Sequence, residues 1–402
     1  MKTPKIGPAF LVTAAFVGPG TVITSTLAGA NFGFALLWAL LFAVFATLIL
    51  QEMAARLALV TGQGLGENLR SFVANPVLKK LLILLVVAAI VIGNGAYQGG
   101  NIAGAALALN AHHTLTFEQL DLWPFIIGLL AFILLFTGSY KLIEKALIVL
   151  VGFMSLAFVM TMVMVNPDFT ALFKGMFIPS LPSGATLTVI ALIGTTVVPY
   201  NLFLHASSVC QKWQGVEHLS DVRKDLFISI PIGGLLSVAI VSTAATAFFG
   251  SQLQIQSAAD IAPALEPLFG DWATWFLSAG LFSAGISSAV TAPLAAAFAL
   301  SGVLGWQNDI KDKRFKLIWI VILVLGIVPA MTGFRPTQII WFAQVANGLL
   351  LPAMAVFLVF LMNHSSLGEH KNSNKQNIMA GLVVLITLLL SGRSLLSAFG
   401  FL

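Results

Sequence analysis

Two short sequences interrupt long apolar stretches of this chain: Gly18-Pro19-Gly20-Thr21 near the amino terminus and Thr195-Thr196-Val197-Val198-Pro199-Tyr200-Asn201 in the middle. A proline inside a helix removes one backbone hydrogen bond and clashes with the preceding turn, at a cost of about 3 kcal/mol. A single proline of this kind is compatible with a simple kink. Two interruptions at matching places of the two halves predict broken helices whose free backbone groups meet at a substrate site.

The composition around these interruptions is that of a polytopic membrane protein. Of the 402 residues, 58% are hydrophobic and 9% are charged, against about 25% charged residues in a typical soluble domain. A helix needs about 20 apolar residues to cross the hydrocarbon core of a bilayer. Runs of that length predict eleven transmembrane helices, at about 7–33, 34–60, 78–109, 122–138, 141–165, 186–211, 226–250, 273–305, 315–332, 336–362 and 377–397.

The positive charges predict the orientation of these helices. With a cytoplasmic amino terminus, 17 of the 20 lysines and arginines lie on the inner side, and only Lys174, Arg335 and Arg393 lie outside. This is the distribution that the positive-inside rule describes. The odd number of helices then places the carboxyl terminus outside. We expect an integral protein of the bacterial inner (plasma) membrane, whose first apolar stretch is a transmembrane helix and not a signal peptide, because no cleavage site follows it.

Several classes of protein are excluded or disfavoured. The single cysteine, Cys210, forms no internal disulfide, and no Cys/His cluster predicts a metal centre or another cofactor. The basic residues form no long block, which argues against nucleic acid as a partner. An enzyme is disfavoured because no nucleophile–base pair is visible. The expected partners are the lipid bilayer and a small-molecule substrate, and the oligomeric state is not predicted.

Five stretches of the sequence resemble the Nramp family of divalent-metal transporters. This resemblance implies an all-α membrane protein with the LeuT-type fold, in which two inverted five-helix repeats (about 7–165 and 186–362) are followed by an eleventh transmembrane helix at about 377–397. The stretches that carry it are GPAFLV…GPGT…AGANFGFALLW, LALVTGQGLGE, YKLIEKALIVLVGF, GTTVVPYNLFLHASSV and LFSAGISSAVTAPLA.

The chain departs from the family pattern at the metal site. The family has Asp-Pro-Gly-Asn in helix 1 and Met-Pro-His in helix 6, where this chain has Gly18-Pro19-Gly20-Thr21 and Val198-Pro199-Tyr200. His205 matches the second histidine of family helix 6. The acidic proton-path positions of helix 3 align with Gln98 and Asn101, the helix 10 glutamine falls at Leu350, and the arginine pair of helix 9 has no equivalent within the span.

The acidic residues lead to the same interpretation without the family. All 15 lie in loops or towards helix ends, with Glu52 the deepest. A dehydrated divalent cation needs anionic oxygen, sulfur or imidazole ligands. We therefore expect that the fold is retained and that the usual metal site is lost.

The predicted pocket is polar but uncharged. The second half of a broken helix exposes N–H groups, here after Gly20, and Gly18 and Gly20 leave room for a ligand such as a carboxylate. The neutral groups expected to complete the substrate site are Thr21, Gln98, Asn101, Thr195, Thr196, Tyr200, Asn201 and Asn347. Threonines in membrane helices also commonly bond their own backbone or a neighbouring helix.

Three further residues are candidates for coupling transport to Na⁺ or H⁺. His205 either carries a proton or makes a structural hydrogen bond. Ser287 and Ser288, together with Ser283, either help to bind sodium or allow close helix packing.

These features predict a secondary active transporter that moves a small polar or anionic organic solute, amino-acid-like or carboxylate, by alternating access. The alternative is a transporter of a divalent cation (Mn, Fe or Mg) that uses carbonyl groups and water as ligands. A further alternative is a non-transporting membrane sensor. A sensor would carry an appended signalling domain, whereas only a few residues follow the last predicted helix.

Overall fold

The computed structural model describes residues 7–118, 120–137, 141–251, 254–306, 311–332 and 334–398, and nearly all of them are helical. One short hairpin, β1 (Thr116–Phe117) with β2 (Leu120–Asp121), lies between two helices. The α-helices are α1 (Pro8–Phe16), α2 (Pro19–Phe32), α3 (Leu37–Thr61), α4 (Leu65–Phe72), α5 (Pro76–Asn110), α6 (Trp123–Thr137), α7 (Lys141–Val165), α8 (Phe169–Phe177), α9 (Thr186–Thr196), α10 (Pro199–Lys212), α11 (Leu219–Phe248), α12 (Glu266–Phe269), α13 (Ala273–Leu304), α14 (Lys313–Met331), α15 (Pro336–Met362) and α16 (Asn374–Ala398).

The helices follow the predicted transmembrane segments. Within the described residues, eight helical segments are long and apolar enough to cross a membrane. The first predicted segment is divided into α1 and α2, and the sixth into α9 and α10, at the two interruptions named above. The short helices α4, α8 and α12 lie in connections where no helix was predicted. The sidedness of the termini stays a prediction.

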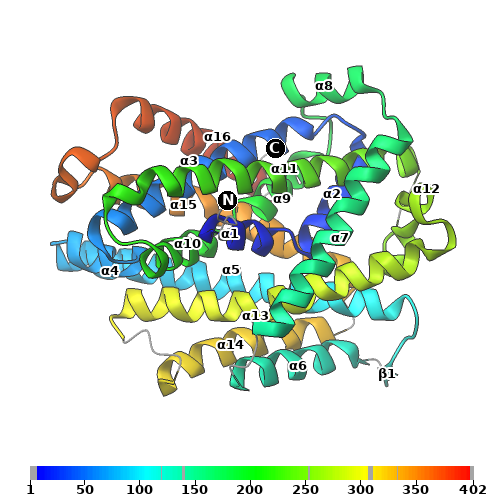
Figure 1. The fold of residues 1–402 in the computed structure, drawn as a ribbon, viewed down its shortest axis with the longest axis horizontal. Coiled ribbons are helices and arrows are strands. Elements are labelled where there is room, and N and C mark those ends of the chain that lie inside the picture. Colours follow the sequence, from blue (N-terminus) through cyan, green and yellow to red (C-terminus); the bar gives the residue numbers. More distant parts are fainter. Residues whose placement is uncertain are drawn as a thin grey trace, which may run out of the picture.

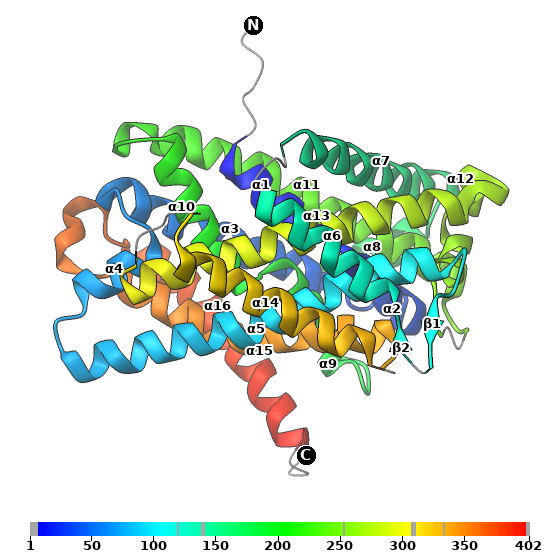
Figure 2. The same ribbon diagram turned by 90° about the horizontal axis from the view of Figure 1, so that it is seen from below.

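The long helices pack in matching pairs. α5 and α13 lie against each other in the middle of the molecule (Figure 1). Around them, the neighbours of α5 correspond to those of α13. α5 packs on α15 and α14, and α13 packs in the same way on α7 and α6. α2 packs on α11 as α10 packs on α3. Two halves with the same internal arrangement give this pairing, although the proposed limits of the two repeats stay a prediction. α16 packs on α15 and extends away from the rest of the bundle (Figure 2).

Glycines allow the helices that carry the breaks to approach each other closely. A side-chain carbon at Gly348 of α15 would lie 2.5 Å from the backbone oxygen of Ile190 on α9, and one at Gly194 of α9 would overlap the backbone oxygen of Gln344. Small residues at such crossings are typical of membrane helix packing, where van der Waals contact replaces the hydrophobic effect. α9 and α15 therefore form a tightly packed unit beside the second break.

Glu52 and two arginines form an ion-pair network. Glu52 of α3 accepts hydrogen bonds from Arg56, one turn later, and from Arg223 of α11, with Nη2–Oε distances of 3.1 and 2.7 Å. Arg56, which is buried, also donates to the backbone oxygen of His370 (2.5 Å) and to Asn372 Oδ1 (2.8 Å). The deepest acidic residue of the sequence is thus part of an ion-pair network that joins α3, α11 and the segment before α16.

Candidate functional site

The two helix breaks have nearly the same backbone geometry. The last residue before each turn is Val17 (φ −78°, ψ 72°) or Val197 (φ −97°, ψ 75°). The next residue, Gly18 or Val198, is extended, and a proline follows as the first residue of the new helix. Proline suits this position because the first N–H groups of a helix have no partner within it. The predicted broken helices therefore both exist, one in each half of the chain.

The backbone of the first break is more fully bonded than the sequence predicted. The Gly18 N–H donates to Phe16 O (2.9 Å), and the N–H groups of Thr21 and Val22 donate to Gly18 O at 3.0 and 3.2 Å. The N–H groups that follow Gly20 are therefore not free to bind an anion in this conformation. Since those groups carried the expectation of a carboxylate ligand, that expectation loses its main support.

A hydrogen bond between two hydroxyl groups joins the breaks. The Thr21 hydroxyl donates to Phe16 O at the end of α1. Thr21 Oγ1 also lies 2.9 Å from Thr195 Oγ1 of α9. Because Thr21 gives its hydrogen to Phe16, Thr195 donates in this pair. Thr196 instead donates to Leu192 O of its own helix (3.2 Å), which is the structural alternative named for the threonines.

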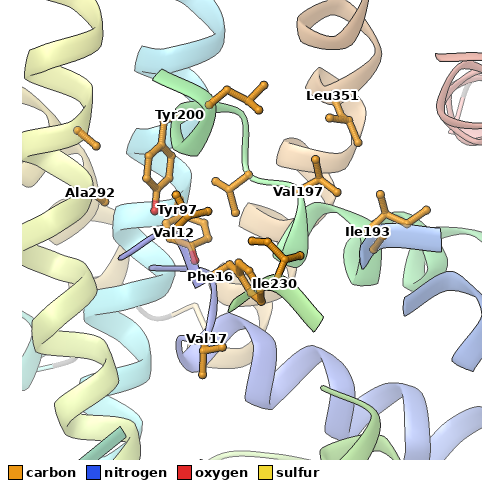
Figure 3. Packing of buried hydrophobic residues seen from close by; sticks show 14 of the residues in the cluster. Val12, Phe16, Val17, Tyr97, Ile193, Val197, Tyr200, Ile230, Ala292 and Leu351 are labelled. Carbon is orange, nitrogen blue, oxygen red and sulfur yellow. The ribbon is translucent and has the colours of Figure 1, made fainter. Parts of the chain in front are cut away.

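Two tyrosines meet beside the first break. Tyr200 of α10 points toward Tyr97 of α5 (Figure 3), with ring centroids 5.5 Å apart and the rings edge to face. A side-chain carbon at Gly18 would lie 3.8 Å from Tyr97 Oη and 3.3 Å from Ser288 Oγ. Tyr97 was not predicted as a site residue, although it adjoins Gln98 in sequence and is one of only three tyrosines in the chain.

Gln344 of α15 is a second residue at the break that was not predicted. Its side-chain amide lies directly against Gly20, so the space expected for a ligand beside Gly20 is occupied by this amide. Gln344 is buried, and its Oε1 atom has no hydrogen-bond partner among the described residues. The sequence did contain a signal for Gln344. Gln344 and Asn347 are polar residues three positions apart, so they lie on one helix face of an apolar span. Leu350, the position aligned with the family glutamine, instead faces Gly93.

Several buried polar groups near the breaks lack partners in the described part of the chain. Both amide atoms of Asn201, both ring nitrogens of His205 and Nδ2 of Asn347 are in this state. All three side chains are at most 1% exposed. An unsatisfied buried polar group costs about 1–3 kcal/mol, so each such group requires an explanation. A bound ligand or ordered water would supply the missing partners.

Two predicted site residues have structural partners. Gln98 donates to Ala289 O of α13 (2.9 Å) and packs against Gly326 of α14. Asn101 donates to Gln98 Oε1 at 3.5 Å. The structure thus places Gln98 between α5, α13 and α14, where it holds the helices together.

The three serines of α13 have different surroundings. Ser283 donates to Ala279 O of its own helix (2.6 Å). Ser288 faces Gly18 at the break. Ser287 lines a cavity of about 320 Å³ between α1, α7, α11 and α13, together with Thr13, Val17 and Ser155. Of the candidate coupling residues on α13, Ser287 is therefore the one beside an open volume.

The break region carries no charge and is closed. The described residues contain no group of three or more His, Cys, Asp or Glu side chains that could hold a metal ion. Thr21, Thr195, Tyr200 and Asn201 are all at most 2% exposed. The described conformation therefore keeps both breaks away from solvent.

Comparisons with known proteins agree with this architecture. A family model described as Natural resistance-associated macrophage protein-like (Nramp) matches residues 9–397. The divalent metal cation transporter MntH of Yersinia pestis (strain Pestoides F) is 29% identical over 406 residues, covering 99% of this chain and 96% of the relative.

Solved structures extend the comparison to the fold. A mutant of the manganese transporter of Eremococcus coleocola superposes with a TM-score of 0.76 at 22% identity, covering 97% of this chain and 86% of the other. Mhp1, a nucleobase-cation-symport-1 family transporter, gives a TM-score of 0.58 at 16% identity, covering 99% and 94%. The chain has the LeuT-type fold and belongs to the Nramp family of secondary transporters.

Proposed function

We propose that this transporter moves a divalent cation that keeps part of its hydration shell. The names of the curated relatives favour a divalent cation, and the comparisons lend no support to the organic solute that the polar, uncharged pocket predicted. The observation that carries the proposal is the set of buried neutral oxygen atoms without partners near the breaks, among them Asn201 Oδ1 and Gln344 Oε1.

The chemistry of these ligands favours a hard cation over a soft one. Val198 stands where the family pattern has methionine, so the sulfur ligand expected for a soft transition metal is absent at that position. Mg²⁺ prefers oxygen ligands, dehydrates reluctantly and usually keeps several waters. Neutral amides that bind the ion through its waters avoid the cost of burying a bare charge without a counter-charge. A hydrated ion of the Mg²⁺ type fits this site better than bare Mn²⁺ or Fe²⁺.

A small polar organic solute is the second candidate, and one observation favours it. Asn201 offers an unsatisfied donor as well as an unsatisfied acceptor, and Asn347 offers an unsatisfied donor. Amide N–H groups cannot bind a cation directly, but they can bind a carboxyl or carbonyl oxygen. A site with both types of group is able to take a neutral or zwitterionic solute.

Alternating access follows from the broken helices. The turn at Val17 and Gly18 connects α1 to α2, and the turn at Val197 and Val198 connects α9 to α10, so each pair of half-helices has a point at which it is able to bend. We assign H⁺ coupling to His205, whose imidazole is buried without a partner among the described residues, or Na⁺ coupling to Ser287 beside the cavity.

Uptake into proteoliposomes tests the proposed cargo. We expect Mg²⁺ uptake by the wild-type protein to exceed uptake of small carboxylates and amino acids, and Gln344→Leu to reduce Mg²⁺ uptake by roughly tenfold or more, the equivalent of about 1.4 kcal/mol. Thr196→Val, which removes only a bond to its own helix, is the matched control and should retain uptake. Saturable uptake of an organic solute without any divalent-cation uptake would reject the cation and support the second candidate.

A further inference from the structure

A groove on the surface of the bundle runs between α5, α14 and α15. It has a volume of about 1070 Å³ and includes none of the break residues described above. Its walls are mainly aliphatic and aromatic side chains: Val91, Ile92, Leu325, Ile339, Trp341 and Phe342. The volume is at the upper end of the range of about 300–1,000 Å³ for small-molecule sites, so the groove is large enough for an extended ligand.

The apolar walls of the groove are exposed. Ile92 is 61% exposed and Phe342 is 63% exposed, and neither is covered by another part of the described chain. Gly95 and Gly99 of α5 also line the groove and let α5 pack closely on Leu325 and Ile339, two other residues of its walls. In a membrane, an apolar surface of this kind is in contact with acyl chains.

One end of the groove is polar and carries a single positive charge. Arg335, at the start of α15, lines this end with Thr337, Gln338 and Gln254. No acidic residue lines the groove, and no carboxylate in the described part of the chain forms an ion pair with Arg335. Its backbone N–H donates to Gln338 Oε1 (3.3 Å).

The positive-inside rule does not account for the charge of Arg335, because the rule places basic residues on the cytoplasmic side. Arg335 is one of only three basic residues on the side predicted to face outward. A guanidinium binds phosphate through two parallel hydrogen bonds. Basic pockets between transmembrane helices on the cytoplasmic side bind anionic lipid head groups, and Arg335 offers the same chemistry on the side predicted to face outward.

We propose that this groove is a binding site for an anionic phospholipid, with an acyl chain along the apolar walls and the phosphate group at Arg335. The apolar walls need an acyl chain, and Arg335 needs an anionic group, so the ligand must carry both. The apolar walls contact an acyl chain by van der Waals packing, and a free phosphate lacks such a chain. A zwitterionic lipid such as phosphatidylcholine fills the walls and also carries a phosphate, but its choline cation offsets the attraction of that phosphate for Arg335.

Native mass spectrometry of the detergent-purified protein tests the proposal. We expect phosphatidylglycerol to remain bound more than phosphatidylcholine with the same chains, and glycerol 3-phosphate not to bind. Arg335→Gln should weaken phosphatidylglycerol binding about fivefold, which corresponds to roughly 1 kcal/mol for one basic residue, and should weaken phosphatidylcholine binding less, because the choline cation offsets the charge of its phosphate. Lys174→Gln changes another outward-side cation, on α8 and outside the groove, and should have no effect.

A variant of the apolar wall tests the other half of the site. Ala96 lines the groove and is partly exposed, so Ala96→Phe fills the groove without disturbing the buried core. It should weaken the binding of both lipids while the lipid-free protein keeps its unfolding temperature. Equal phosphatidylglycerol binding by wild-type protein and Arg335→Gln, or by wild-type protein and Ala96→Phe, would overturn the proposal.

Discussion

The two broken helices share one backbone conformation but use it differently. At the first break, Gly18 and Gly20 flank the proline; Ser288 of α13 lies close to Gly18, and the amide of Gln344 of α15 lies where a side chain of Gly20 would be. At the second break, Val198 and Tyr200 flank the proline, and Tyr200 and Asn201 extend from it. The first break is therefore a place of close packing, and the second is a source of polar side chains.

This difference shows that a broken helix is not by itself a binding site. Free N–H groups were expected at the first break, but Thr21 and Val22 bond to Gly18 O. Unsatisfied groups occur instead at Asn201 in the second break and at Gln344, which reaches the first break from α15. We infer that helix interruption supplies mobility and that side chains supply the ligands.

The largest expected effect comes from adding side chains to glycines near each break. Gly194→Leu places carbon atoms on the backbone of Gln344 and Gly348, which cannot move without separating α9 from α15. Overpacking typically costs about 1–3 kcal/mol, and we expect more than about 3 kcal/mol here because the obstacle is backbone. The variant should fail to purify as a monodisperse protein on size-exclusion chromatography.

Gly20→Ala is the matched variant at the first break. Its added carbon meets only the amide of Gln344, the mobile end of a side chain. We therefore expect normal purification but reduced uptake, with Gly20→Leu more severe than Gly20→Ala. Full uptake by a well-folded Gly20→Leu protein would exclude the first break from the substrate path.

Asn201→Leu should separate function from stability at the second break. Leucine has a similar volume and removes two amide atoms that are buried without partners among the described residues. Since such atoms cost about 1–3 kcal/mol each, the unfolding temperature should stay the same or rise. Uptake should fall roughly tenfold or more, the equivalent of about 1.4 kcal/mol. A lower unfolding temperature with uptake intact would show that Asn201 is a structural residue.

The smallest expected effect concerns the hydroxyl bridge between the breaks. Thr195→Val removes one hydrogen bond, worth about 1 kcal/mol, and Thr21→Val removes that bond and the one to Phe16 O. Thr21→Val should therefore lower the free energy of unfolding more than Thr195→Val. In a double-mutant cycle, the two changes together should cost less than their sum. Strict additivity would mean that the bridge contributes nothing.

The prediction of the helices was accurate because it depends on local composition. Each transmembrane segment is a run of about 20 apolar residues, and the bounds of most of the long helices agree with the predicted ones to within several residues. The short helix α4 was missed because its first turn carries Glu67 and its last turn carries Arg70, so it has no apolar run of membrane length.

The candidate site was predicted less well. Gln98 and Asn101 were chosen because they are polar residues in an apolar span, yet they bond to each other and to α13. Gln344 has the same sequence signal and is unsatisfied at the break. Polarity in a membrane helix identifies residues that need partners, but whether the partner is another helix or a ligand depends on what lies opposite.

Neighbouring residues were enough to predict the membrane-spanning helices, the positions of their two interruptions and the absence of charge at those interruptions. Proline alone was not sufficient for a break, since α13 and α15 continue through Pro293 and Pro352. Which groups meet became known from the tertiary structure alone. Thr21 and Thr195 are 174 residues apart, and Gly20 and Gln344 are further apart still. Such contacts depend on how whole helices cross, which no local pattern of the chain specifies.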